Sequence, residues 1–131
     1  MAIQIEMLGG ARLIPTGGGS HLPGSLRQYM GDSRGHWEGN TLVVETSNFT
    51  NRTLYRGAAE NLTLVERFTK VDATTLEYRF TVTDPTTFVR PWTASVPYLA
   101  TDEQLFEYAC HEGNYGMEGI LSGARVEEAK K

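Results

Sequence analysis

Hydrophobic and polar residues alternate along most of this chain, and a period of two residues is typical of strands with one buried face. The clearest run covers 74–83, where Leu76, Tyr78 and Phe80 alternate with polar residues. The same pattern predicts about eight strands. The tail over 117–129 is expected to form one helix instead, with Ile120, Leu121 and Ala124 on one side. The strands are expected at 3–7, 12–14, 36–38, 41–47, 61–69, 74–83, 87–98 and 104–111.

Glycine, proline and aspartate mark the turns between these strands. Gly9-Gly10 and Gly39-Asn40 each join the two arms of a hairpin. The region 16–31 contains five glycines and one proline, which predicts a long loop with one helical turn over 25–29. Long loops in small domains often cover a site. A polar loop is expected over 49–60.

Short antiparallel strands with one terminal helix predict a mainly β fold. A closed, lipocalin-like, up-and-down barrel is favoured, because closure leaves no exposed edge strand. A β-sandwich or jelly roll is the alternative. With 131 residues, of which 40% are hydrophobic, the chain is expected to form a single domain over 1–131. A barrel of about eight strands is wide enough to hold one small ligand.

Two charged residues stand where the alternation predicts a buried side chain. Glu66 lies in phase with Leu64 and Phe68, and Arg90 lies in phase with Trp92. An unpaired buried charge is strongly unfavourable, so Glu66 and Arg90 are expected to pair with each other or to face a wet cavity. An ion pair that only fixes the strand register explains the pattern equally well.

The segment 106–112 is the richest in reactive side chains. Glu107 and His111 share one face of the expected strand, which makes them candidates for proton transfer. A strand-end histidine that bonds a neighbour is the simpler alternative for His111. Cys110 is disfavoured as a nucleophile, because the adjacent histidine points to the opposite face of a strand.

A second polar cluster precedes the Gly39-Asn40 turn. His36 and Glu38 share a face of the short strand, and Glu38 is a candidate acid or base. Solvation beside a turn is the simpler explanation for Glu38. Arg34 can hold an anionic or carbonyl oxygen through its planar guanidinium, or it can pair with Asp32.

The charge and the apolar content exclude several classes of partner. A net charge of −4 and the lack of a basic cluster before the C-terminal lysines argue against nucleic-acid binding. No apolar stretch approaches the roughly 18 residues that span a bilayer, so no membrane insertion is expected. The single cysteine forms no internal disulfide, and the first residues lack the features of an export signal. We expect a soluble protein of unassigned compartment, with a homodimer left open.

A metal centre is a weaker hypothesis. Its ligands would be His36, Glu38, His111 and Glu112, with His21 as a further donor. Their spacing differs from the two-histidine strand pattern of cupins and from the CxxC and HExxH motifs. No cofactor is therefore expected.

General acid–base catalysis is the function that these residue types favour. A carboxylate, a histidine and an arginine around a partly apolar cavity suit a lyase, hydratase, isomerase or hydrolase. Aromatic residues suit a small, neutral, sugar-like or phenolic substrate. The alternatives are a barrel that binds a ligand without reacting and a metal-dependent, cupin-like enzyme. The candidate catalytic residues are Glu107, His111, Glu38 and Glu66. The candidate substrate-binding residues are Arg34, Arg90, Asp32, Trp92 and Tyr108.

Four sequence segments contain most of these candidate residues: GDSRGHWEGNTLVV, VERFT, DPTTFVRPW and FEYACHEGNYGM. They resemble an uncharacterised family of bacterial proteins from soil and metagenomic sequences, and the likeness extends over nearly the whole chain. Members usually carry a longer N-terminal region, often with an export signal. Many have arginine at the position of His36, which weakens the metal hypothesis. The resemblance implies a site but no particular activity. The recurrent strings include Asp32, Arg34, Trp37, Glu38, Glu66, Arg90, Trp92, Glu107, Cys110, His111 and Glu112.

Overall fold

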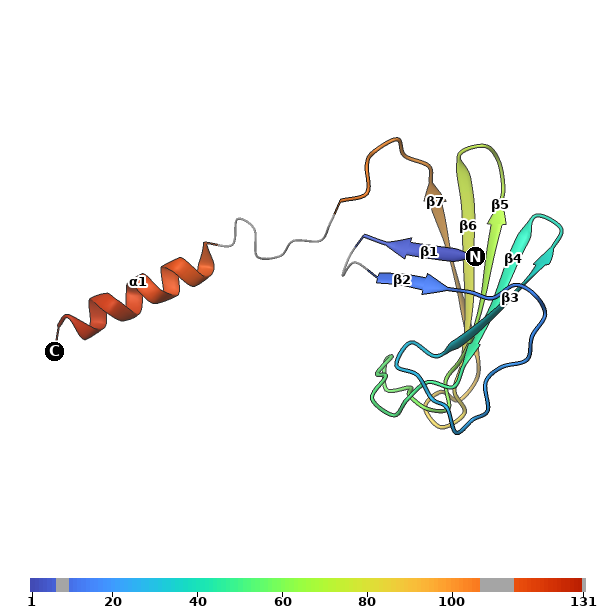
Figure 1. Ribbon diagram of the computed structural model, residues 1–131, viewed down its shortest axis with the longest axis horizontal. Coiled ribbons are helices and arrows are strands. Elements are labelled where there is room, and N and C mark those ends of the chain that lie inside the picture. Colours follow the sequence, from blue (N-terminus) through green and yellow to red (C-terminus); the bar gives the residue numbers. More distant parts are fainter. Residues whose placement is uncertain (7–9, 107–114, 131) are drawn as a thin grey trace. The chain divides into compact units, whose positions relative to one another are not determined.

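The computed structural model describes residues 1–6, 10–106 and 115–130. Within these ranges the protein is mainly β, with seven strands in two antiparallel sheets and one helix (Figure 1). The elements are β1 (Ala2–Ile5), β2 (Gly10–Leu13), β3 (Asp32–Glu38), β4 (Thr41–Ser47), β5 (Thr63–Lys70), β6 (Thr75–Thr83), β7 (Trp92–Leu99) and α1 (Gly116–Glu128).

The larger sheet is an antiparallel meander in which β3 to β7 are neighbours in chain order (Figure 1). Its register places Gly35, Val44, Glu66, Phe80 and Ala94 opposite one another across the five strands. These residues and those two positions away along each strand form one face, which we call the packed face. The alternate residues form the opposite, polar face. The alternation of the sequence thus predicted the phase of β5, β6 and β7.

Two clusters of buried hydrophobic residues include side chains of this sheet. In one of them, Ile14 packs with Leu42 and Val44. Gly35 allows this approach, because a Cβ atom there would lie 2.9 Å from Ile14 Cγ2. The other cluster brings the loop after β4 onto the sheet, and its buried members are Phe49, Ala58, Leu62 and Val82.

The described chain divides into two compact units. One contains Met1–Ile3 and Ala11–Glu103, and therefore the larger sheet and both core clusters. The other contains Gln4–Gly10 and Gln104–Lys131. It includes α1, which lies within one residue of the predicted helix and has no buried residue. No helix in the described ranges is long and apolar enough to cross a membrane.

The larger sheet is not closed into the barrel that the sequence favoured. Among the described strands, β3 and β7 each have one neighbour and are the edges of the sheet. The expected strand over 104–111 is not present at 104–106, and the remainder lies outside the described residues. The expected helical turn over 25–29 consists instead of turns and a single β-bridge.

The prediction that Arg90 lies inward on a strand is wrong. The Asp84 carbonyl oxygen accepts the N–H groups of Thr87 and Phe88 at 3.1 and 2.8 Å, which folds this segment into turns. Pro91 has no N–H to donate to a sheet. Strand β7 therefore begins only at Trp92, and Arg90 is exposed before it. Alternation reveals the phase of a strand but not its first residue.

Candidate functional site

Strand β3 carries two polar clusters on its opposite faces. Side chains alternate along a strand, so Asp32 and Arg34 point to the polar face, whereas Ser33 points to the packed face. We call the first group, made of His21, Asp32 and Arg34, the His21–Asp32 cluster. The second group, the Glu66 cluster, consists of Arg12, Ser33, Thr46, Glu66 and Tyr78.

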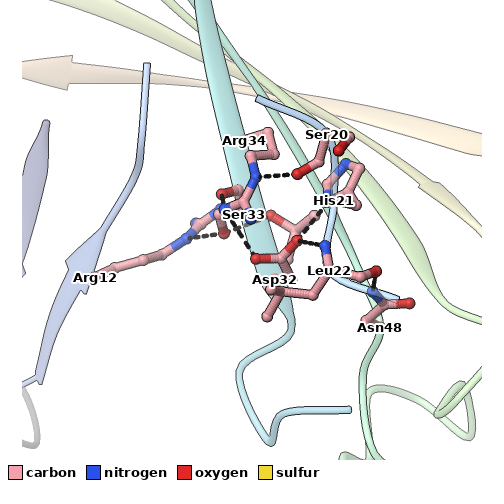
Figure 2. A network of polar contacts seen from close by, with 9 residues as sticks. Arg12, Ser20, His21, Leu22, Asp32, Ser33, Arg34 and Asn48 are labelled. Carbon is pink, nitrogen blue, oxygen red and sulfur yellow. Dashed lines mark hydrogen bonds and ion pairs between the residues drawn. The ribbon is translucent and has the colours of Figure 1, made fainter. Parts of the chain in front are cut away.

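The Asp32 carboxylate is the centre of the His21–Asp32 cluster (Figure 2). Its side chain is only 5% exposed. Oδ2 accepts hydrogen bonds from His21 Nδ1 and from the Leu22 N–H, each at 2.9 Å. Oδ1 lies 2.9 Å from Arg34 Nη1. A strand residue thus holds a loop histidine and a strand arginine on one carboxylate.

A glycine directly before Asp32 makes this placement possible. Gly31 has φ of +70°, in the left-handed region that other residues rarely adopt. A Cβ atom at Gly31 would lie 2.7 Å from Thr46 Cγ2 and 2.8 Å from the Ser47 carbonyl oxygen. The chain can therefore turn tightly against β4 and enter β3 at Asp32.

Asp32 is ionised at neutral pH despite its burial. Burial alone would raise its pKa, but the Leu22 N–H, the hydrogen bond from His21 and the positive charge of Arg34 together lower the pKa below its ordinary value. An ionised carboxylate cannot donate a proton, so Nδ1 of His21 must be the donor. The neutral imidazole then has its lone pair on Nε2.

His21 and Arg34 both keep one free polar edge. The His21 side chain is 30% exposed, and within the described chain Nε2 makes no hydrogen bond. Arg34 Nε donates to the Ser20 carbonyl oxygen at 2.8 Å, and Nη1 donates to that of Ser33 at 3.0 Å. Its Nη2 has no partner among the residues that the structure describes. His21 Nε2 can therefore accept a proton, and Arg34 Nη2 can donate a hydrogen bond to an oxygen atom. Both side chains are held by the carboxylate of Asp32.

The Glu66 cluster joins the N-terminal segment to the packed face. Glu66 is 3% exposed, as its phase predicted, but its partner is Arg12 and not Arg90. Arg12 Nη1 donates to Oε1 at 3.0 Å, and Nη2 donates to Oε2. The hydroxyl of Tyr78 donates to Oε1 at 2.9 Å. Because both carboxylate oxygens are bonded, this arrangement favours a structural role.

The remaining members of this cluster keep the Arg12 guanidinium in place. It donates to Ser33 Oγ at 3.2 Å and to Thr46 Oγ1 at 2.8 Å. Burial, and then the charge of Glu66, raise the pKa of Tyr78. The tyrosine hydroxyl therefore stays protonated and acts as a fixed donor.

Glu38 lies on the polar face near the tip of the β3–β4 hairpin. It bonds Arg67 at 2.7 Å and His36 at 3.2 Å, and these two bonds lower its pKa. The side chains of His36 and Glu38 are about half exposed, and that of Arg67 is 38% exposed. This matches the simpler explanation of a solvated glutamate. The shared face of His36 and Glu38 is confirmed.

Several predicted site residues lie outside the described residues. They are Glu107, Tyr108, His111 and Glu112, and the disfavoured nucleophile Cys110 lies outside them as well. Two of the four expected metal ligands are among them, so that set stays a prediction. In the part of the chain that the structure describes, no three His, Cys, Asp or Glu side chains are grouped as a metal site.

The packed face also carries a row of aromatic rings. Tyr78 stacks with Phe68 at 4.8 Å and with Tyr98 at 5.5 Å between ring centroids. Phe80 meets Trp92 edge to face at 5.6 Å. Tyr98 is 47% exposed and lines an open cavity of about 320 Å³. Tyr78, Phe80 and Trp92 thus lie on one face of the larger sheet.

The sequence did not indicate the roles of His21 and Arg12. His21 lies in the glycine-rich loop, where no periodic pattern shows which side chain turns inward. The buried position of Glu66 predicted a positively charged partner, but the sequence did not show that this partner is Arg12. Comparison with protein-family models, curated proteins and solved structures finds no match to this chain.

Proposed function

We propose that this protein catalyses an acid–base reaction on a small molecule at the His21–Asp32 cluster. The observation that carries the proposal is the buried carboxylate of Asp32, which bonds Nδ1 of the 30% exposed His21 and leaves Nε2 without a hydrogen bond among the described residues. In this arrangement His21 is the proton-transfer residue, and Asp32 orients the ring and stabilises the imidazolium.

The proposed reaction begins with a neutral His21. Nε2 takes a proton from a water molecule or from the substrate, and the resulting imidazolium is stabilised by the negative charge of Asp32. Arg34 Nη2 donates to a substrate oxygen on which negative charge develops. In a hydrolase or a lyase, His21 then gives this proton to the leaving oxygen. In a hydratase or an isomerase, no group leaves, and His21 gives the proton to a substrate carbon instead.

The preferred substrate is a small, neutral, sugar-like or phenolic molecule. The sequence alone suggests this substrate class, and it alone suggests the roles of Glu107 and His111. The aromatic row lies on the packed face, whereas Asp32 points to the polar face, so the row does not itself support ring binding beside His21.

A panel of 4-nitrophenyl esters and 4-nitrophenyl glycosides tests the proposal, because both release a chromogenic phenol. The His21→Gln variant is expected to lower kcat/KM by about 100-fold or more for any panel member that is turned over. Asp32→Asn should lower it as well, because the ring loses its orienting carboxylate. The matched control is His36→Gln, an exposed histidine that also bonds a carboxylate.

The panel contradicts the proposal in two ways. One is an activity that survives in the His21→Gln protein within a factor of about three, since general acid–base catalysis supplies more than that. The other is an equal loss in the His36→Gln control, which would separate the activity from the His21–Asp32 cluster.

Ring binding without reaction is a second candidate function. The exposed ring of Tyr98 beside an open cavity favours it. Titration with 4-nitrophenol, followed by NMR, is expected to shift the signals of Tyr98 and Leu76, which both line the cavity. Tyr98→Ala should remove these shifts. Unchanged signals at saturating 4-nitrophenol would contradict this candidate.

A further inference from the structure

We propose that Asn48 is a positioning residue that holds the His21 loop in place for proton transfer, an inference that rests on the proposed function. Asn48 directly follows β4, and Ser47 before it pairs with Asp32. Asn48 therefore stands at the same end of the β3–β4 hairpin as the central carboxylate of the cluster.

Three hydrogen bonds hold the main chain on either side of His21 (Figure 2). Side chains of β3 bond the Ser20 carbonyl oxygen at 2.8 Å and the Leu22 N–H at 2.9 Å. The third bond comes from beyond the end of β4, where Asn48 Nδ2 donates to the Leu22 carbonyl oxygen at 2.7 Å. The main chain is thus held at Ser20 before His21 and at Leu22 after it. The bond from Asn48 is the one that does not come from β3.

The backbone of Asn48 is as constrained as its side chain. Its φ of +56° lies in the left-handed region, and its carbonyl oxygen accepts the Gln28 N–H at 2.8 Å. Glycine adopts this conformation without strain, and aspartate tolerates it nearly as well as asparagine does. Neither can donate a hydrogen bond to Leu22. The turn at position 48 requires a residue that tolerates a positive φ. The His21 loop requires the side-chain amide of Asn48, because that amide donates to Leu22.

Two substitutions distinguish the hydrogen bond made by the Asn48 side chain from the backbone conformation of the turn. Asn48→Gly keeps the backbone conformation, and Asn48→Asp keeps the shape, but both remove the donor. The control is Asn40→Asp, because Asn40 Nδ2 makes the same kind of bond to the Lys70 carbonyl oxygen at 2.8 Å, in the turn after β3. Thermal unfolding of each protein establishes that the variants are folded.

The readouts are the tautomer of His21, from ¹⁵N NMR of its imidazole, and the hydrogen-exchange rate of the Leu22 amide. Both Asn48 variants are expected to mix the His21 tautomers and to speed exchange at Leu22 by about fivefold, the loss of one net hydrogen bond. Asn40→Asp should change neither. A purely structural role would lower the melting temperature and leave the tautomer of the folded protein unchanged.

The outcomes distinguish the two proposals. Unchanged His21 spectra and Leu22 exchange in the folded Asn48→Gly protein would overturn the positioning role alone. A change in Asn48→Asp but not in Asn48→Gly would also overturn it, because repulsion from the new carboxylate would then be the cause. Protonation of His21 on Nε2 in the unaltered protein would overturn the proposed function, and the positioning role with it.

Discussion

Asp32 is the residue on which most of the site depends. It is nearly buried, yet it bonds a histidine, an arginine and a backbone N–H at once. A carboxylate with three donors is stable as an anion, and an anion at this point defines the tautomer of His21. Its contribution to stability must therefore depend on pH.

The substitution Asp32→Asn is expected to lower the free energy of unfolding by about 2 kcal/mol at neutral pH. Because the folded-state pKa of Asp32 is below its ordinary value of 3.8, the stabilisation is complete above that pH and is lost as the pH falls through the folded-state pKa. Urea unfolding from neutral pH down to about pH 3 measures the difference. A gap between the two proteins that does not narrow in acid would contradict this expectation.

The Glu66 cluster should respond to single substitutions in a graded way. Tyr78→Phe removes one donor to a buried carboxylate and is expected to lower the free energy of unfolding by about 1.5 kcal/mol. Glu66→Gln leaves the Arg12 guanidinium without its counter-ion and should lower it by about 3 kcal/mol. Glu38→Gln, in an exposed ion pair, should cause little change. Denaturant unfolding measures all three, and an equal effect of Glu38→Gln and Glu66→Gln would show that burial is not the cause.

Strand β3 is the element that organises both clusters. Its alternation sends Asp32 and Arg34 to one face and Ser33 to the other, and two glycines make room for its neighbours. The strand's hairpin with β4 was predictable from the Gly39-Asn40 turn and the β-branched run after it. Its extension back to Asp32 was not, because a sequence of charged and small residues has no clear apolar phase.

The Gly31→Ala substitution tests whether the tight turn before β3 requires glycine. The added Cβ would meet Thr46 Cγ2 at 2.7 Å in addition to the strain of a positive φ. Gly39→Ala is the matched control, since Gly39 has φ of +59° and open space around it. We expect a loss of about 1 kcal/mol for Gly39→Ala and roughly 3 kcal/mol for Gly31→Ala. Equal losses in thermal unfolding would mean that the contact with β4 is unimportant.

At the scale of the whole molecule, the sequence predicted what is local and periodic. The mainly β class, the antiparallel pairing of the strands and the C-terminal helix are confirmed. Barrel closure depends on how the edge strands pair, which no local pattern specifies. The polar clusters depend on distant contacts such as that between Arg12 and Glu66, which are 54 positions apart. The phase of a strand predicts that a charged side chain is buried, but it does not identify the partner.

The larger sheet is expected to unfold as one cooperative unit, because consecutive strands share long ladders and the core clusters join their loops to them. Its two tryptophans, Trp37 on β3 and Trp92 on β7, report on its opposite edges. Single-tryptophan variants, made by replacing either one with phenylalanine, should therefore show coincident changes in fluorescence and circular dichroism. Separate midpoints for the two edges would contradict one unit.

The most direct test of the His21–Asp32 cluster is the tautomer of neutral His21 in the intact protein. Long-range ¹H–¹⁵N NMR at about pH 8 distinguishes a proton on Nδ1 from one on Nε2, because most histidines are then neutral. His36 is an internal reference, since its Nε2 is the atom that contacts Glu38. We predict a proton on Nδ1 for His21 and on Nε2 for His36. A proton on Nε2 of His21 would contradict the account, because that nitrogen would then have no lone pair with which to accept a proton.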